Sequence, residues 1–301
     1  MVRLFKISMF LKILRQLGWL LIYLFALIGF VLVGGFFALR FGWTNTSGVV
    51  DINDRYFSEV VNKVRQTKEA DSAQAIFNYN CQSLGKISYA WMAPPDWPVL
   101  KEAIIKDQSQ ITRVSDETGV SARLLVSMLV GEQLRLFTSD REVFKQIFQP
   151  LKILGVQSKF SWGVMGMKEE TAEQIEINLQ DKNSPFYLGP EFERLLVFKT
   201  ENPSAERFAR LTDSHDHYYS YLYTSLYIKQ IMKQWELAGY DISDRPEILA
   251  TLFNLGFAKS VPKAEPQVGG AEIEVGGQKY SFGGLAFQFY YSGELIDYFK
   301  W

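Results

Sequence analysis

The hydrophobicity pattern begins with an apolar run near the N-terminus. Residues 17–39 contain no charged side chain, and roughly 20 apolar residues suffice to cross the hydrocarbon core of a bilayer. Basic residues are concentrated before the run, at Arg3, Lys6, Lys12 and Arg15, whereas only Arg40 follows closely. Because positive charge collects on the cytoplasmic side, the pattern predicts a single transmembrane helix over 17–39, with residues 1–16 inside the cell.

A cleaved signal peptide is the alternative interpretation of this run. Such a peptide has a shorter apolar core and ends in a small-x-small cleavage site. Here the run ends in Phe36-Phe37-Ala38-Leu39-Arg40, which is a poor site. The length and the flanks therefore favour a retained anchor.

Beyond residue 40 the apolar positions recur mainly at helical spacing. A charged segment over 54–75 fits one or two amphipathic helices, and stronger helices are predicted over Pro98–Thr118, Ala122–Leu136, Lys168–Leu179, Tyr218–Ala238 and Ile248–Leu255. Ala271–Phe282 instead alternates around Gly276-Gly277, which is typical of a β-hairpin. We therefore expect a mainly α fold with a small C-terminal β-hairpin, preceded by one transmembrane helix. Residues 40–110 are expected to form a linker and a membrane-proximal helical extension, and 111–301 the main domain.

Composition narrows the function classes. The chain of 301 residues carries 32 basic and 33 acidic side chains, a formal net charge of -1. That balance gives no electrostatic footprint for nucleic acid. The single cysteine, Cys81, permits neither an intramolecular disulfide nor a metal site built from thiolates alone.

The candidate chemistry centres on Glu132. It follows Met128 by four residues and Leu129 by three, so a helix places it on their apolar face. Burial on such a face favours the protonated carboxyl group that a general acid needs. An ion pair with Arg135, three residues further along, is the structural alternative. Spacing alone does not decide between them.

Two later segments carry a resemblance to a known family. Ser161–Ala172 contains Gly163, Val164, Met165, Thr171 and Ala172 in an order similar to the Gly-Leu-Met-Gln…Thr-Ala loop and helix start of lytic transglycosylases. The segment 250–256, Ala-Thr-Leu-Phe-Asn-Leu-Gly, resembles that family's Ala-x-Tyr-Asn-x-Gly. With Glu132 first, the three motifs stand in the family's order over roughly 111–257. The sequence thus resembles the lysozyme-like lytic transglycosylases of glycoside hydrolase family 23.

The resemblance implies a lysozyme-like α+β fold and a membrane-anchored enzyme acting on the glycan strands of peptidoglycan outside the bacterial cytoplasmic membrane. Glu132 would protonate the glycosidic oxygen between N-acetylmuramic acid and N-acetylglucosamine, and then deprotonate the C6 hydroxyl to close a 1,6-anhydro ring. No metal or organic cofactor is implied. A cell-envelope complex is an expected partner. The implied substrate-binding residues are Gly163, Val164, Met165, Gly166, Thr171, Phe253 and Asn254.

The sequence also departs from the family. Gln133 follows the acid where the family has Ser, Gly166 replaces the loop Gln, and Phe253 replaces the usual Tyr. Residues 137–160 form an insertion. These departures keep open a catalytically weak, peptidoglycan-binding scaffold protein. A domain that only mediates protein contacts is a further alternative.

Two other site types remain open. A hydrolase would need a second carboxylate, for which Glu169, Glu170 and Asp140 are candidates. The pair His215 and His217, flanked by aspartates, has the composition of a zinc site but equally that of an exposed loop before a helix. Asn254 is likewise explained by a structural role as a helix C-terminal cap.

Overall fold

The computed structural model describes residues 15–16, 18–31, 33–34, 89–137 and 161–301. The described residues up to 34 belong to one compact unit, and residues 89–137 and 161–301 belong to another. The predicted helices over 54–75 and most of the predicted extension over 40–110 lie outside the described residues.

The prediction of a transmembrane helix over 17–39 is wrong by the structure. Residues 15–16, 18–31 and 33–34 of this region are helical. Within the part of the chain that the structure describes, no helix has both the length and the apolar character to cross a membrane. The predicted location as a single-pass protein of the cytoplasmic membrane is therefore wrong as well.

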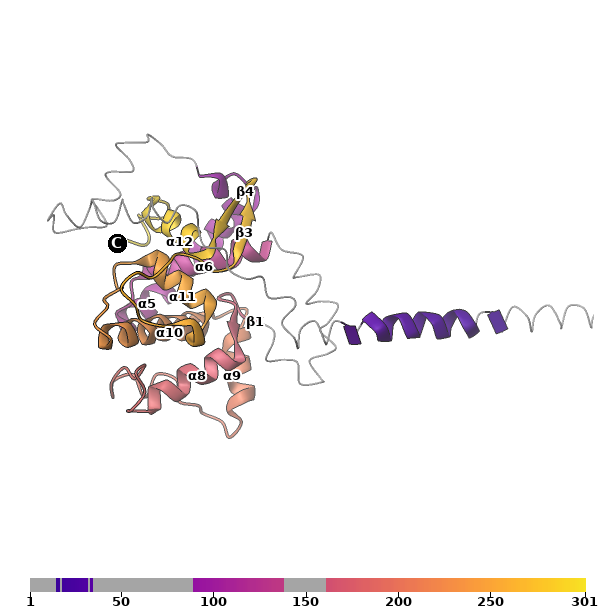
Figure 1. Ribbon diagram of the computed structural model, residues 1–301, viewed down its shortest axis with the longest axis horizontal. Helices are drawn as coiled ribbons and strands as arrows, with labels where there is room; N and C mark the ends of the chain where they lie inside the picture. The colour runs from indigo at the N-terminus through magenta and orange to yellow at the C-terminus, as the bar shows by residue number, and fades with distance from the viewer. Residues whose placement is uncertain (1–14, 17, 32, 35–88, 138–160) are drawn as a thin grey trace, which may run out of the picture. The chain divides into compact units, whose positions relative to one another are not determined.

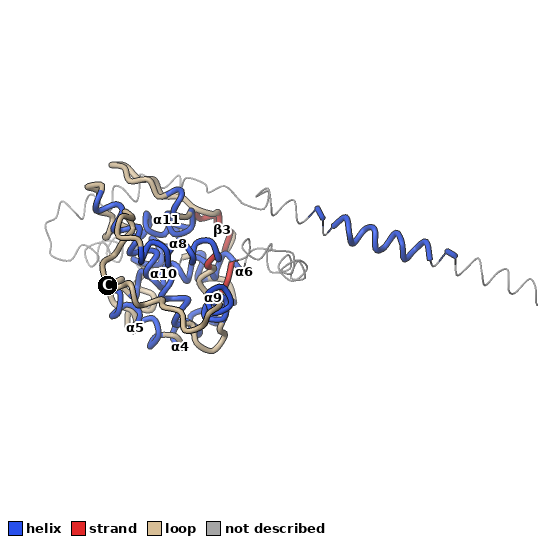
Figure 2. Tube along the Cα trace, turned by 90° about the horizontal axis from the view of Figure 1, so that it is seen from below, coloured by secondary structure: helices blue, strands red, loops and turns tan. Residues whose placement is uncertain are grey.

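The unit formed by 89–137 and 161–301 is mostly helical (Figures 1 and 2). Its helices are α4 (Asp96–Lys106), α5 (Gln108–Thr118), α6 (Ala122–Phe137), α8 (Glu169–Gln180), α9 (Pro203–Thr212), α10 (Tyr218–Leu237), α11 (Pro246–Leu255) and α12 (Phe282–Tyr291). Short 3-10 helices, η1 (Ala90–Met92) and η4 (Phe257–Lys259), complete the helical elements described. The mainly α expectation therefore holds for this unit.

The described strands form two antiparallel hairpins, not one. β3 (Glu272–Val275) pairs with β4 (Gln278–Ser281) around Gly276-Gly277, so the predicted hairpin is confirmed. β1 (Ser161–Trp162) pairs with β2 (Met167–Lys168) around a glycine turn that the sequence did not identify as a hairpin. Strands of two residues are too short to show an alternating pattern.

The helix predicted over Pro98–Thr118 is broken at Asp107 into α4 and α5. The carboxylate of Asp107 accepts a hydrogen bond from the hydroxyl of Tyr221 over 2.6 Å and lies 2.6 Å from Nδ1 of His217. Both partners lie at the start of α10. The break thus places the carboxylate of Asp107 against α10, which is more than a hundred residues away in the sequence.

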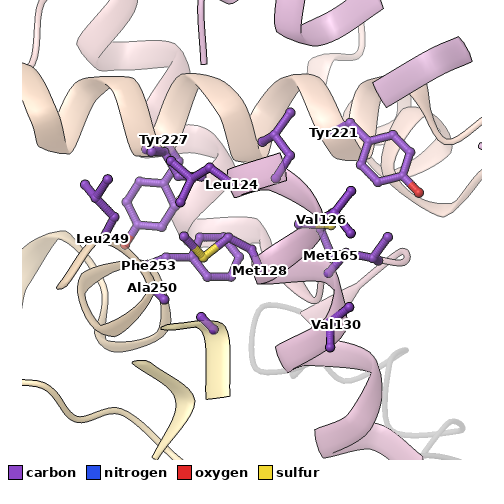
Figure 3. Packing of buried hydrophobic residues seen from close by; sticks show 14 of the residues in the cluster. Leu124, Val126, Met128, Val130, Met165, Tyr221, Tyr227, Leu249, Ala250 and Phe253 are labelled. Atoms are coloured by element: carbon purple, nitrogen blue, oxygen red, sulfur yellow. The ribbon is translucent and has the colours of Figure 1, made fainter. Parts of the chain in front are cut away.

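α6 is the central helix of this unit. Residues 123–132 are all buried, including the polar side chains of Arg123, Ser127 and Glu132. Figure 3 shows Met128 of α6 beside Phe253 of α11, with Tyr227 of α10 close by. In Figure 1, α10 and α11 lie between α12 with β3 and β4 above and α8 with α9 below. The helix that carries Glu132 is therefore held by the core on all sides.

A buried arginine ties the C-terminal segment to α6. Arg123 is 0% exposed and donates hydrogen bonds to four main-chain carbonyl groups. These belong to Phe289 (3.1 Å), Tyr290 (2.6 Å), Glu294 (2.9 Å) and Phe299 (3.2 Å). Burial lowers the pKa of Arg123 to about 10, which leaves the guanidinium charged at neutral pH. The buried charge is thus stabilised by carbonyl dipoles, and the carboxylate of Glu294 adds to this effect.

Candidate functional site

Glu132 lies in the penultimate turn of α6, where its side chain is only 4% exposed. The guanidinium of Arg135, three residues along the same helix, donates a short hydrogen bond to Glu132 Oε2. Arg135 is itself 13% exposed, so the ion pair is largely withdrawn from water. The structural alternative that the spacing had left open is therefore present.

The glycine turn of the second motif covers this carboxylate. Gly166 has φ +61°, and a Cβ atom added there would lie 2.7 Å from Glu132 Oε2 and 3.1 Å from its Cδ. The turn is closed by a hydrogen bond from the amide of Gly166 to the carbonyl oxygen of Gly163, over 3.2 Å. Only a glycine both adopts this conformation readily and lets the backbone approach so closely. The fold therefore brings Glu132 and Gly166 into direct contact.

A second tether joins α6 to this turn. Gln133 donates from Nε2 to the main-chain carbonyl oxygen of Val164 over 2.5 Å. Gln133 is the residue that departs from the family pattern after the acid, and sequence reasoning assigned it no role. A long amide at this position reaches the loop, whereas a serine side chain would be too short. The polar side chain of Gln133, next to a predicted buried acid, was the feature of the sequence that could have indicated this role.

The other residues of the turn differ in burial, and Gly163 is exposed. Met165 is 0% exposed, and Val164 packs against the same core from a partly buried position. Gly163 has φ +66°, and a Cβ there would meet the carbonyl oxygen of Leu211 at 2.0 Å and Ser220 Oγ at 2.6 Å. Thr171 is partly buried in α8. Met165 therefore packs in the core, and Gly163 allows a close approach to Leu211 and Ser220. The substrate contacts that the resemblance implied for these residues stay predictions.

The third motif lies on α11, which contacts α6. Phe253 is 8% exposed, with its ring 5.7 Å from Tyr227 and 6.0 Å from Phe282 between centroids. Asn254 Oδ1 accepts a hydrogen bond from the amide of Ala271 over 2.8 Å. Asn254 therefore fixes the segment that leads into β3. The residue that caps the C-terminus of α11 is Gly256.

The candidates for a second carboxylate are not placed against Glu132 by any contact described. Glu169 accepts a hydrogen bond from Ser204 Oγ over 2.9 Å and lies 3.7 Å from Nη1 of Arg207. It therefore links α8 to α9. Glu170 lies beside it in the first turn of α8. Asp140 lies outside the described residues.

The two histidines lie in different environments. His215 is exposed, whereas His217 is partly buried and bonded to Asp107. Among residues 89–137 and 161–301, and in the described N-terminal segment, no group of three or more metal-ligating side chains is found. His217 has a structural task at the α5–α10 contact.

Three surface pockets of this unit are lined by residues other than Glu132. One follows the outer side of α5, and two others share Met232 and Ser243 beside α10. Comparison with known proteins adds no assignment. No family model matches this sequence, and neither a curated protein nor a solved structure matches it.

Proposed function

We propose that this chain is a peptidoglycan lytic transglycosylase in which Glu132 is the single acid and base. The observation that carries the proposal is the contact between Glu132 and Gly166. Two of the three motifs that resemble the family, more than thirty positions apart, meet at one buried carboxylate. A carboxyl group beneath a glycine turn is shielded from bulk water, as acid–base catalysis on a glycosidic bond requires.

The reaction needs one carboxyl group, where most glycosidases use two. Protonated Glu132 donates its proton to the glycosidic oxygen as the C1–O bond of N-acetylmuramic acid breaks. Ionised Glu132 then removes the proton of the C6 hydroxyl, whose oxygen bonds to C1 and closes the 1,6-anhydro ring. The enzyme ends in its starting protonation state, and no water is consumed. Arg135 is paired with Oε2 in the resting structure, so Arg135 must swing aside and Glu132 must take up a proton before the first step.

The test is a product analysis with purified peptidoglycan and the full chain. We expect the wild type to release muropeptides with 1,6-anhydro ends, and Glu132→Gln to release none. Glu247→Gln is the matched control, because Glu247 is also buried and paired with an arginine, Arg245. It should retain wild-type activity. Reducing ends in place of anhydro ends would indicate hydrolysis and a second carboxylate.

A scaffold protein that binds peptidoglycan without cleaving it is the second candidate. The specific observation in its favour is the 4% exposure of Glu132 together with its ion pair to Arg135. A permanently paired, buried carboxylate serves stability and not catalysis. Sedimentation with insoluble peptidoglycan, without release of fragments by the folded wild type, would support this candidate and exclude the enzyme.

A further inference from the structure

A groove runs along the outer side of α10, away from Glu132. Lys229, Met232, Lys233 and Glu236 follow at helical spacing, so they share one face of the helix and form its floor. The groove has a volume of about 470 Å³, and a neighbouring pocket of about 240 Å³ continues it past Met232 and Ser243 towards Gly119 and Ser121. The distance along α6 from Ser121 to Glu132 is roughly 16 Å at 1.5 Å per residue. The groove is therefore distinct from the proposed catalytic carboxylate.

Lys229 is the cation of this groove that lacks a carboxylate. Its ammonium group lies 5.1 Å from the centroid of the Phe192 ring and, within the described residues, forms no ion pair. The other groove lysine, Lys233, is paired with Glu236 over 2.9 Å. A partly buried ammonium group without an acceptor gains most from a ligand carboxylate.

Glu191 gives the groove a complementary negative charge. It is exposed, and its carboxylate lies against the backbone of Gly189, where a Cβ would meet Oε2 at 2.6 Å. No ion pair to Glu191 is found in the described part of the chain. Asp241 also lines the groove. Lys229 and Glu191 thus supply charges of both signs that form no ion pair within the described residues, a pattern that suits a ligand with charges of both signs.

The shape of the groove argues for a peptide. The groove floor from Lys229 to Glu236 extends about 10 Å along the helix axis, which is the length of roughly three extended residues. Sugars are usually held by open aromatic faces and neutral polar groups. Here the ring of Phe192 is only 9% exposed and lies beneath Lys229. Met232 provides a small apolar floor suited to an alanine methyl group.

We propose that this groove binds the peptide stem of peptidoglycan, with a stem carboxylate at Lys229 and a stem amino group at Glu191. The identity of the ligand rests on the proposed function, whereas the preference for an amphoteric peptide rests on the groove alone. The site would select strands that carry peptide stems over naked glycan and hold them at a distance from Glu132.

The experiment is calorimetric titration of the full chain with the stem-type tripeptide alanyl-γ-D-glutamyl-lysine. We expect the wild type to bind it, and Lys229→Gln to bind about tenfold more weakly after loss of one charge-assisted hydrogen bond. Lys263→Gln, at an exposed position outside the groove, is the matched control and should bind as wild type. Circular dichroism checks that each variant is folded.

A second variant tests the other charge. Glu191→Gln should weaken binding of the tripeptide several-fold, but should not affect a tripeptide whose amino groups are acetylated. Absence of wild-type binding at millimolar peptide, or equal binding by Lys229→Gln, would overturn the proposal. Because binding is measured without turnover, peptide binding by a chain that releases no fragments would refute the transglycosylase alone. Anhydro products without peptide binding would refute the groove alone.

Discussion

The backbone of Gly166 rests on the carboxylate of Glu132, so closely that a methyl group at position 166 would lie 2.7 Å from Oε2. A charged group this deeply buried is costly unless its environment compensates it. Arg135 provides that compensation on one side, and the glycine turn closes the other. This arrangement makes the region sensitive to small changes in side-chain size and charge.

Gly166→Ala should lower the free energy of unfolding by more than the strained backbone conformation at this position accounts for. A non-glycine residue in the left-handed region costs about 1–2 kcal/mol, and the contact with Glu132 should add at least about 1 kcal/mol. Gly277→Ala is the control, since Gly277 has φ +75° with nothing within 4 Å of the added methyl group. Urea unfolding of both variants measures the difference. Equal losses would show that the contact with Glu132 is not tight.

Arg135→Met should cost about 3 kcal/mol, because it leaves the charge of Glu132 buried without a partner. The double variant Glu132→Gln/Arg135→Met should regain most of that loss, since it removes both charges. A double-mutant cycle by urea unfolding gives the coupling free energy. Additive effects would mean that the pair is solvated in solution.

Gln133→Ala should remove the hydrogen bond to Val164 and cost about 1 kcal/mol. Amide hydrogen exchange in residues 163–166 should accelerate by a similar free energy. Gln180→Ala is the control, because Gln180 donates a comparable bond to the carbonyl of Glu193 at an exposed site. Unchanged exchange in the 163–166 turn would contradict the tethering role of Gln133.

Glu247 should make stability depend on pH. Burial raises the pKa of Glu247 above its ordinary value of 4.5, partly offset by Arg245. The folded state therefore holds its proton more tightly than the unfolded state. The contribution of Glu247 to the stability of the folded state is complete below about pH 4.5. It is lost as the pH rises through the raised pKa of the folded state.

The replacement Glu247→Gln removes this titration. The melting temperature of Glu247→Gln relative to wild type should therefore be higher at pH 8 than at pH 4.5. Differential scanning calorimetry at both values measures it. A difference that does not change with pH would show that Glu247 is not buried as described.

The local pattern predicted the long elements well. α6 was predicted over Ala122–Leu136 and lies over Ala122–Phe137, and the β3–β4 hairpin was predicted from its alternation around Gly276-Gly277. These succeed because burial on one face, or on every face, imposes a spacing on the sequence itself. α9 and α12 were not predicted. α12 begins with Phe282-Gly283-Gly284, and glycines are poor helix formers.

α12 is a helix because its glycines are needed for packing. A Cβ at Gly283 would lie 2.3 Å from Thr251 Oγ1 on α11, so the close approach of α11 and α12 outweighs the low intrinsic propensity. The break at Asp107 has a similar origin, since its partners Tyr221 and His217 are distant in sequence. Neither feature can be read from local spacing.

The sequence by itself determined most of the long helices, the β3–β4 hairpin and the position of Glu132 on a helix face that is otherwise apolar. The apolar run over 17–39 is also read from the sequence, but no helix that could span a membrane is found in the described residues. Only the tertiary structure decided that Glu132 pairs with Arg135 and lies under Gly166. These contacts join residues through packing of separate elements, and such distances are set by the whole core and not by sequence spacing.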